Sequence, residues 1–457
     1  MTFDLVIRNG RLVDESGVRA GDIGVVDGQI AATGEALGAA RTELDAAGRH
    51  VIPGGVDSHV HLGQLSSKGD LTADSFWTGS RSALHGGTTT VVPFAAQHRG
   101  MKIADVFADA MRRAEEEMAT DYGMHLIITD WNESAAEELA EAADAGLTAV
   151  KIYLTYDRLK VAGDLALELI GAATRHGLPV MVHAEFDELV VQGRDEMIDA
   201  GALGATSHAH SHSRRAEWLG VTQAIELADR TGAALYLAHV STPEAIDIAT
   251  DARGAGVNVV AETCPHYLIL DESEYDSPIE AAAPFMCSPP LRGEHDRAGL
   301  LDRLASGAVD LVTSDHSPYT LEQKVPNGPA TKFTEAANGL PGIELRLALL
   351  YTHAVTTNRI TMPDFVRLTA AEPARLCGMY PRKGSLDIGA DADLVIWEDA
   401  PWLVNWDRLH DNVGYTPYER MQLQGYASTV VVAAEVVIAN GENSIGPGRG
   451  RFIPRSG

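Results

Sequence analysis

Six polar residues stand at the ends of apolar segments, and their side chains are of the kinds that bind cations or move protons. They are four histidines, one lysine and one aspartate: His59, His61, His183, His239, Lys151 and Asp315. Residues i and i+2 of a strand point to the same side, so the two imidazoles of His59-Val60-His61 can converge on one ion. Imidazole and carboxylate are ligands of Zn²⁺ and similar borderline ions. A lone histidine is more often a satisfied polar residue than a ligand, but the six together predict a metal site.

Lys151 is the unusual member of this set, because an ammonium group cannot bind a cation. Its amine would become a ligand if CO₂ carboxylated it, since the two oxygens of the resulting carbamate can bridge two metal ions. The alternative is a structural ion pair between Lys151 and Asp315.

The elements that must position these residues form an alternating pattern. Apolar segments typical of strands are separated by Ala-, Leu- and Glu-rich stretches typical of helices, which predicts a parallel sheet with crossover helices. Eight segments indicate an α/β fold of the (β/α)₈ barrel type, with the polar residues at its C-terminal face; an open doubly wound sheet is the alternative. The segments are Val51–Leu62, Thr88–Phe94, His125–Thr129, Ala149–Leu154, Pro179–His183, Leu235–Val240, Val257–Glu262 and Val309–Ser314, and the intervening helices include Ile103–Met118, Glu133–Ala145, Leu165–His176 and Pro243–Ala255.

Both ends of the chain have the composition of antiparallel β-structure. Asn9-Gly10 and Asp27-Gly28 each lie between short strand-like segments and predict hairpin turns, and Ala392–Trp397 and Ser428–Ile438 are apolar and β-branched. We therefore expect a barrel over residues 53–378 and a smaller β-sandwich domain built from residues 1–52 and 379–457.

The remaining histidines carry weaker predictions. His208, His210 and His212 alternate with small residues between two barrel strands, and we interpret them as a solvated loop. His266 follows the seventh strand and either approaches the site or has a structural role. His316 is expected to support its neighbour Asp315.

Composition excludes several classes of function. The chain has 457 residues, 45% of them hydrophobic, and a net charge of −28, which is ordinary globular composition but makes nucleic acid a poor partner. Its three cysteines are widely spaced, so neither a disulfide framework nor a thiolate zinc site is expected. No apolar stretch reaches the length of a membrane span, and the first residues do not form a signal peptide. We expect a cytoplasmic protein that does not bind membranes.

The segments around these residues resemble the dihydropyrimidinase and D-hydantoinase family of the amidohydrolase superfamily. The resemblance runs from end to end, and its more specific parts are the segment from Lys151 to Tyr156, the Ser288–Arg292 segment and the Asn338–Glu344 segment. Further matching segments are PGGVDSHVH (53–61), GGTTT (86–90), VHAE (182–185), AHVS (238–241), ETCP (262–265), SDH (314–316) and GSLDIGADADL (384–394).

This resemblance implies two divalent metal ions, most commonly zinc, with a hydroxide between them. His59, His61, carboxylated Lys151 and Asp315 would hold one ion, and Lys151, His183 and His239 the other. The resemblance further implies that Asp315 acts as general base and then general acid. Tyr156 would stabilise the tetrahedral oxyanion, and Ser288 and Asn338 would hold the amide edge of the substrate ring, largely through backbone groups.

The implied reaction opens the cyclic amide of a 5,6-dihydropyrimidine or a 5-substituted hydantoin to an N-carbamoyl amino acid. Dihydroorotases tend to carry an arginine two residues after the HxH motif, and here Leu62-Gly63-Gln64 follows instead, so that carboxylate clamp is absent. The rival hypotheses are allantoinase or another cyclic-ureide hydrolase, and a non-catalytic scaffold like the collapsin response mediator proteins. Family members are usually homotetramers, and the segment Trp402–Tyr426, with Trp406, Tyr415 and Tyr418, either supplies contacts between subunits or packs on its own barrel.

Overall fold

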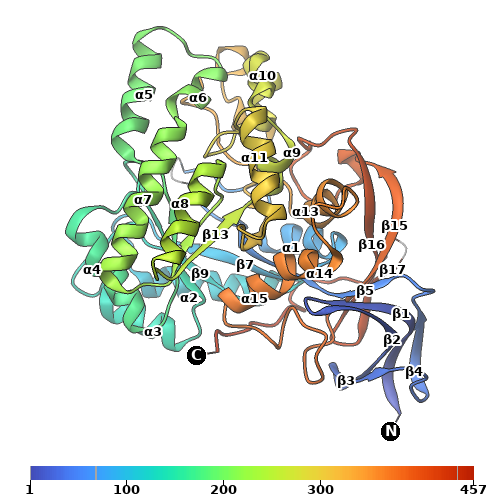
Figure 1. The fold of residues 1–457 in the computed structure, drawn as a ribbon. Coiled ribbons are helices and arrows are strands. Elements are labelled where there is room, and N and C mark those ends of the chain that lie inside the picture. The colour runs from blue at the N-terminus through green and yellow to red at the C-terminus, as the bar shows by residue number, and fades with distance from the viewer. Residues whose placement is uncertain (1, 67–68, 440, 457) are drawn as a thin grey trace.

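The computed structural model describes residues 2–66, 69–439 and 441–456. Two sheets organise the chain, and helices surround one of them. The two ends of the chain lie on one side of the molecule and contribute to the second sheet, which stands beside the barrel (Figure 1).

Parallel strands in the order of the chain form the first sheet. They are β6 (Gly55–Val60), β7 (Thr88–Ala96), β9 (His125–Ile127), β10 (Ala149–Tyr153), β11 (Val180–His183), β12 (Leu235–Leu237), β13 (Val259–Thr263) and β14 (Leu311–Val312), with β8 (Asp121–Tyr122) paired to β7. A parallel bridge between Val60 and His316 joins the last strand's continuation to the first strand and closes the ring. Most strand residues are buried on both faces, as a barrel covered by helices requires. The predicted (β/α)₈ barrel with a smaller β-domain from both termini is therefore confirmed.

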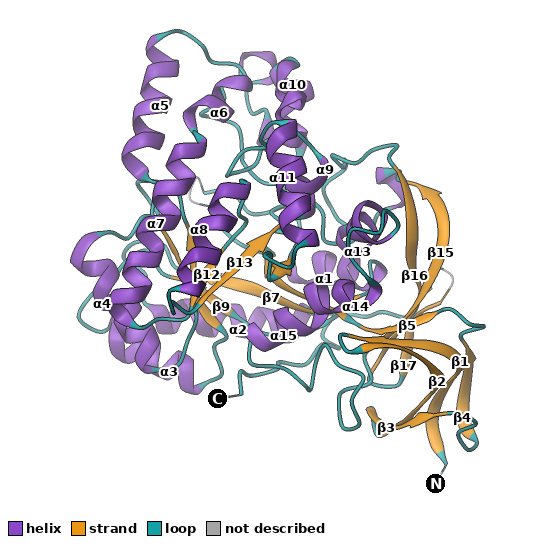
Figure 2. Ribbon diagram, viewed as in Figure 1, coloured by secondary structure: helices purple, strands orange, loops and turns teal. Residues whose placement is uncertain are grey.

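Helices alternate with the barrel strands and lie outside them (Figure 2). They are α1 (Phe76–His85), α2 (Ile103–Glu117), α3 (Ala135–Asp144), α4 (Gly163–Arg175), α5 (Asp187–Asp199), α6 (Thr206–Ser211), α7 (Arg214–Thr231), α8 (Pro243–Gly254), α9 (Pro265–Ile269), α10 (Ile279–Ala282), α11 (Glu294–Ala305), α12 (Leu321–Lys324), α13 (Arg346–Leu350), α14 (Met362–Val366) and α15 (Glu372–Leu376). Short 3₁₀ turns span Glu272–Asp276, Ala283–Phe285, Gly328–Ala330 and Trp406–Arg408, and π turns span Tyr351–Val355 and Arg367–Ala371. No helix among the described residues has the length and apolar character needed to cross a bilayer.

The second sheet combines strands from both ends of the chain. Its main path runs β18-β17-β16-β15-β5-β1-β2-β3, and β4 pairs with β1. The strands are β1 (Phe3–Asp14), β2 (Gly17–Val26), β3 (Gln29–Gly34), β4 (Ala40–Asp45), β5 (His50–Pro53), β15 (Leu394–Leu403), β16 (Gln422–Val432), β17 (Glu435–Ala439) and β18 (Glu442–Asn443). A separate apolar cluster that includes Leu5, Ile23, Leu394 and Val431 forms its core.

The predicted first barrel segment, Val51–Leu62, divides between the two sheets. β5 pairs with β15 of the terminal sheet, whereas β6 pairs with β7 of the barrel. Gly54 lies between them, and a Cβ there would stand 2.1 Å from Thr89 Oγ1, so glycine permits the close approach of the two sheets. The domain boundaries at residues 52 and 378 remain our proposal.

One of the two predicted hairpins is wrong. Asp27-Gly28 does turn the chain between β2 and β3, but Asn9-Gly10 lies inside the continuous strand β1. The pairing register of β1 with β2 shifts between Ile7 and Gly10, and Asn9 has φ of 54°, so the dipeptide forms a bulge. Asp22 stabilises this bulge because its carboxylate accepts the Asn9 backbone N–H at 2.9 Å.

Candidate active site

The six predicted ligand residues all lie where barrel strands end. His59 is in β6 and His61 follows it, Lys151 is in β10, and His183 ends β11, while His239 and Asp315 stand shortly after β12 and β14. Because the strands are parallel, these ends meet on one face of the barrel. None of the six residues is more than 8% exposed. The structure therefore brings them together in a buried site.

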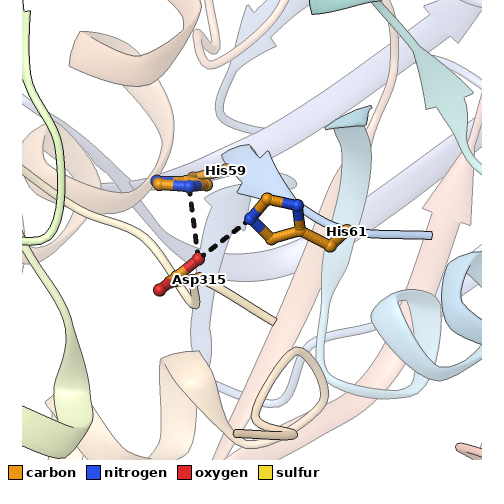
Figure 3. Close-up of side chains that lie close together, drawn as sticks. All are labelled: His59, His61 and Asp315. Carbon is orange, nitrogen blue, oxygen red and sulfur yellow. Dashed lines mark ion pairs between the residues drawn. The ribbon is translucent and has the colours of Figure 1, made fainter. Parts of the chain in front are cut away.

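Three of the six form the tightest group. Asp315 Oδ1 lies 3.2 Å from His59 Nε2 and 3.3 Å from His61 Nε2, and both rings turn toward the carboxylate (Figure 3). One ligand atom from each residue falls within 4.8 Å of the others. This spacing suits a single metal ion.

The other three predicted ligands adjoin this group. Lys151 Nζ lies 3.5 Å from His59 Nε2, and His183 Nδ1 lies 3.0 Å from His239 Nε2. The ring centroids of His59 and His239 are 5.5 Å apart. His59 therefore lies beside both Lys151 and the His183–His239 pair.

The hydrogen bonds of the His59 and His61 rings on the side away from Asp315 determine which ring nitrogens can bind a metal. The Nδ1 atoms of His59 and His61 face acceptor oxygens, at 2.9 Å on Glu262 and at 2.7 Å on Gln64. Each Nδ1 then carries the proton, and each Nε2 directs a lone pair at the Asp315 carboxylate. Acceptors that face one another in a buried site require a cation between them, so this group fits a metal ion.

The second histidine pair fits a cation for the same reason. His183 Nε2 lies 2.8 Å from a Glu185 oxygen, so that nitrogen carries the proton and His183 Nδ1 offers a lone pair. His239 Nδ1 is buried and has no hydrogen-bond partner in the described part of the chain. An imidazole whose proton sits on that atom would direct its Nε2 lone pair toward His183.

Two glutamates that sequence reasoning did not single out support the ligands. Glu262 accepts hydrogen bonds from His59 Nδ1, from the His239 backbone N–H at 2.7 Å and from the Tyr236 hydroxyl. Glu185 accepts hydrogen bonds from His183 and at 2.9 Å from His212 Nδ1. Both glutamates lie in segments that match the family, but their role could be recognised only from the hydrogen bonds that they accept in the folded structure.

Burial controls the protonation of the site. Desolvation lowers the pKa of His61, His183 and His239, which keeps these rings in the neutral form that binds metals. Desolvation also lowers the pKa of Lys151 to about 8. A substantial fraction of this amine is therefore neutral near physiological pH, as reaction with CO₂ requires.

Asp315 and Tyr156 hold opposite protonation states. Burial favours the neutral form of Asp315, but positive charge on the adjacent histidines, His59 first, lowers the pKa of its carboxyl well below the usual range. A cation held by the same rings in their neutral form acts on the carboxylate in the same direction. Burial and the Glu185 carboxylate raise the pKa of Tyr156 well above 10. Asp315 is thus an ionised proton acceptor and Tyr156 a protonated donor.

A cavity of about 210 Å³ opens onto these groups. The three predicted substrate-binding residues, Tyr156, Ser288 and Asn338, all line it, together with five of the six predicted ligands. Asn338 Oδ1 is buried without a hydrogen-bond partner among the described residues. A side-chain acceptor is therefore available to a ligand, in addition to the backbone groups that the resemblance implied.

The backbone is strained at three of these positions. Tyr156, His239 and Asp315 have φ of 73°, 39° and 43°, in the left-handed region that residues with a Cβ rarely adopt. Such strain persists where the surrounding structure over-determines a conformation, and it is concentrated at functional sites.

Two predictions about the other histidines are wrong. His208 and His212 do not lie in a solvated loop. His208 is in α6 and His212 follows it, both side chains are buried, and of the three histidines only His210 is exposed. His316 does not support Asp315 through its ring, since Nε2 pairs with Asp74 at 3.0 Å and Nδ1 accepts the Gly342 N–H.

The His266 ring is buried beside Tyr267, with the ring centroids 4.2 Å apart. It lies outside the group formed by His59, His61 and Asp315. Its Nε2 atom is buried without a hydrogen-bond partner among the described residues, so both interpretations of this histidine stay open.

Comparison with known proteins agrees with this architecture. The profile of the Amidohydrolase family matches residues 50–438. A D-hydantoinase from Ralstonia pickettii is 35% identical over 99% of both chains. A solved D-hydantoinase structure (34% identical, 99% of both chains) and that of a dihydropyrimidinase from Brevibacillus agri (32% identical, 99% of this chain and 98% of the other) each superpose with a TM-score of 0.95. The chain therefore belongs to the dihydropyrimidinase and D-hydantoinase family of amidohydrolases.

Proposed function

We propose that this protein hydrolyses the cyclic amide of a 5,6-dihydropyrimidine or a 5-substituted hydantoin to an N-carbamoyl amino acid. The observation that carries the proposal is the group His59, His61 and Asp315, of which His61 and Asp315 line a cavity together with Tyr156 and Asn338. That cavity combines ligands for a cation with an ionised base and a protonated donor.

We further propose that the resident metals are two zinc ions and that Lys151 is carboxylated. His59, His61, Lys151 and Asp315 would hold one ion, and Lys151, His183 and His239 the other. The donor set supports zinc, since it combines imidazole and carboxylate without thiolate. When bound, such ions lower the pKa of water so that a nucleophile exists at neutral pH, and they polarise the substrate carbonyl.

Asp315 moves the proton in this proposal. Its ionised carboxylate accepts a proton from the attacking water, whose oxygen bonds to the ring carbonyl carbon. Asp315 then returns that proton to the ring nitrogen as the C–N bond breaks. The low pKa of its carboxyl keeps Asp315 ionised, which is the form that can accept a proton.

Three residues of the cavity wall would orient and stabilise the substrate. The Tyr156 hydroxyl would donate a hydrogen bond to the tetrahedral oxyanion, because its raised pKa keeps it protonated. Ser288 and Asn338 would hold the amide edge of the ring, with the unpartnered Asn338 Oδ1 as a further acceptor for a ring N–H.

A substrate panel tests the proposal. Purified protein loaded with Zn²⁺ is assayed with dihydrouracil, hydantoin, D- and L-5-phenylhydantoin, allantoin and dihydroorotate, and the carbamoyl products are identified by mass spectrometry. We expect turnover of one or more of the first four compounds. Exclusive turnover of allantoin or dihydroorotate would replace the proposed substrate class, and no turnover of any compound would favour the scaffold hypothesis.

We also propose a cytoplasmic homotetramer. The three buried, unpaired cysteines support a reducing compartment. Tyr415 and Tyr418 are buried within their own chain, but Trp406 and Leu403 are about half exposed and offer apolar surface for a second subunit. Light scattering on the eluate of a sizing column would give the number of subunits directly.

A further inference from the structure

Glu185 is a buried carboxylate on which three parts of the site converge. It stands two residues after His183 and has no exposed surface. Its Oε2 atom lies 2.8 Å from His183 Nε2 and 3.3 Å from the Tyr156 hydroxyl, and its Oε1 atom lies 2.9 Å from His212 Nδ1. One side chain thus touches a predicted metal ligand, the predicted oxyanion donor and a residue that the proposed mechanism does not use.

Tyr156 is the member of this group with the weakest tether. The loop that carries it is fixed at its flanks, because Thr155 and Lys160 both bond to Asp187 at the start of α5. Its phenol, in contrast, donates one long hydrogen bond, at 3.3 Å to Glu185, and another polar neighbour is the Ser288 side chain. The hydroxyl has one proton, which it donates to Glu185 in this structure and would turn to the oxyanion during the reaction. The starting position of the hydroxyl therefore depends on where Glu185 is held.

His212 holds the other side of Glu185, and it is itself firmly anchored. It follows α6, its backbone N–H bonds to the His208 carbonyl at 3.2 Å, and its own carbonyl accepts a hydrogen bond from Arg292. Arg292 is 6% exposed and donates at 3.0 Å to Ser241 Oγ. Arg292 also ends the Ser288–Arg292 segment, so His212 is fixed to the loop that contributes Ser288 to the cavity.

We propose that Glu185 and His212 form a positioning pair for the reaction, in which His212 fixes the carboxylate that orients the Tyr156 phenol and the His183 imidazole. This inference rests on the proposed function for its effect on turnover. It also gives a role to the histidine cluster at 208–212, which the ligand set leaves out. Neither Glu185 nor His212 is among the residues that line the cavity at the predicted ligands. His212 lines a second, smaller cavity of about 170 Å³, which Tyr156 also lines.

The first experiment replaces His212. In His212→Ala the carboxylate loses a donor, and we expect kcat to fall on the order of 10–100-fold, the usual cost of removing a residue that orients a ligand, with KM within about threefold. In His212→Asn the amide N–H can take the place of Nδ1–H and should restore most of the loss. His210→Ala is the matched control, since that histidine lies in α6, two residues before His212, and is exposed.

The activities of these three variants together show whether His212 positions Glu185. Loss in His212→Ala with recovery in His212→Asn supports the pair. Equal activity of His212→Ala and His210→Ala would overturn it, and so would equal losses in His212→Ala and His212→Asn, because a merely structural role would not be rescued by one hydrogen bond.

A double-mutant cycle tests whether Glu185 acts through Tyr156. Glu185→Gln keeps the shape of the side chain, but its amide cannot accept hydrogen bonds at both ends. We expect the loss of kcat caused by Glu185→Gln to be at least about threefold smaller in a Tyr156→Phe background than in the parent. Losses that simply multiply would show that the two residues act independently and would overturn this part.

Metal binding separates this inference from the proposed function. Apoproteins of the parent, Glu185→Gln and His212→Ala are titrated with Zn²⁺ in competition with a chromophoric chelator. We expect a loss of affinity of about 10-fold or more for the ion held through His183. If the parent hydrolyses no cyclic amide while this loss appears, the proposed function fails and the pair stands. Unchanged affinity together with unchanged kcat in an active enzyme would overturn the pair and leave the proposed function in place.

Discussion

At the scale of single residues, the chemistry of the site follows from which nitrogen of each ring is already occupied. Glu262 and Gln64 take up the Nδ1 protons of His59 and His61, so two lone pairs face the Asp315 carboxylate. Because the site is buried, these acceptors are costly unless a cation pairs with them. Lys151 completes the set only as a carbamate, and its amine is prepared for that reaction by a pKa of about 8.

Replacing Lys151 by alanine removes the group that would be shared by both ions. We expect Lys151→Ala to lose at least about 10³-fold in kcat, because the reaction then loses the chemistry that both ions supply. Elemental analysis should show near two zinc ions per chain in the parent and fewer in the variant. Lys332→Ala, a change at an exposed lysine, is the control; full activity of Lys151→Ala would refute the ligand assignment.

Carboxylation of Lys151 should depend on pH in a defined direction. Only the neutral amine reacts with CO₂, and the neutral fraction rises as pH increases through about 8. We therefore expect bicarbonate to accelerate the recovery of activity when chelator-treated protein receives Zn²⁺. The bicarbonate-dependent rate, at fixed dissolved CO₂, should climb between pH 7 and pH 9 and then level off. A recovery rate that does not depend on bicarbonate, or that decreases over that pH range, would contradict the proposal that Lys151 is carboxylated.

At the scale of elements, the barrel could be predicted because burial on both faces gives its strands unbroken apolar segments. The segments Thr88–Phe94 and Ala149–Leu154, for example, correspond to β7 and β10 within two residues. Since catalytic groups of a barrel stand at strand ends, the ligand residues could be located from the same segments.

Other elements could not be predicted from local pattern. The alternation of histidines with small residues at 208–212 indicates a solvated loop, but the rings of His208 and His212 are buried. The Cys287 carbonyl and Glu185, both remote in sequence, provide the hydrogen bonds that these two imidazoles need. Asn9-Gly10 has hairpin composition, yet pairing of β1 with its neighbours on both sides continues the strand. In each case a tertiary hydrogen bond or pairing overrides the local preference.

The joint between the two sheets, where Lys383 meets Asp121, Asp391 and Asp393, contains a buried ion network whose contribution to stability can be measured. Lys383 is 2% exposed and contacts three carboxylates, those of Asp121 of β8 and of Asp391 and Asp393, which precede β15. Lys383→Met would leave the buried Asp393 carboxylate without its cation, whereas Arg451 still pairs with Asp121 and Asp391. We expect a loss of about 3–5 kcal/mol in the free energy of unfolding. Chemical denaturation monitored by circular dichroism measures this loss.

The pH dependence of this variant has a definite sign. Burial already raises the pKa of the Asp393 carboxyl, and without Lys383 that pKa should rise further above the value in the unfolded chain. The folded state then binds more protons than the unfolded one, so the deficit in stability should shrink as pH falls from 7 toward 5. Arg382→Met is the control, because Arg382 reaches only Asp391 from a partly exposed position. A deficit that grows on acidification would contradict the assignment.

At the scale of the whole molecule, the predicted metal ligands come from strands distributed around the barrel. They arrive from β6, β10 and β11 and from the segments after β12 and β14, so ions bound to them would link parts of the chain that are separated by more than 250 residues. The net charge of −28 does not oppose this, because the local charge of the site is set by the ions themselves.

Metal should therefore stabilise the folded chain as a whole. An ion that binds only the folded state adds RT ln(1 + [L]/Kd), or about 4 kcal/mol at a thousand times its Kd. We expect Zn²⁺ to raise the thermal midpoint of chelator-treated protein by several degrees, as measured by circular dichroism. Mg²⁺ at the same concentration should have little effect, because it prefers oxygen ligands and the site offers four imidazoles. Lys383→Met should lower the midpoint while leaving the Zn²⁺ increment intact, since the ion pairs of Lys383 in the described part of the chain are with Asp121, Asp391 and Asp393 and not with site residues. Equal shifts with both metals, or none with zinc, would show that these histidines do not form a metal centre.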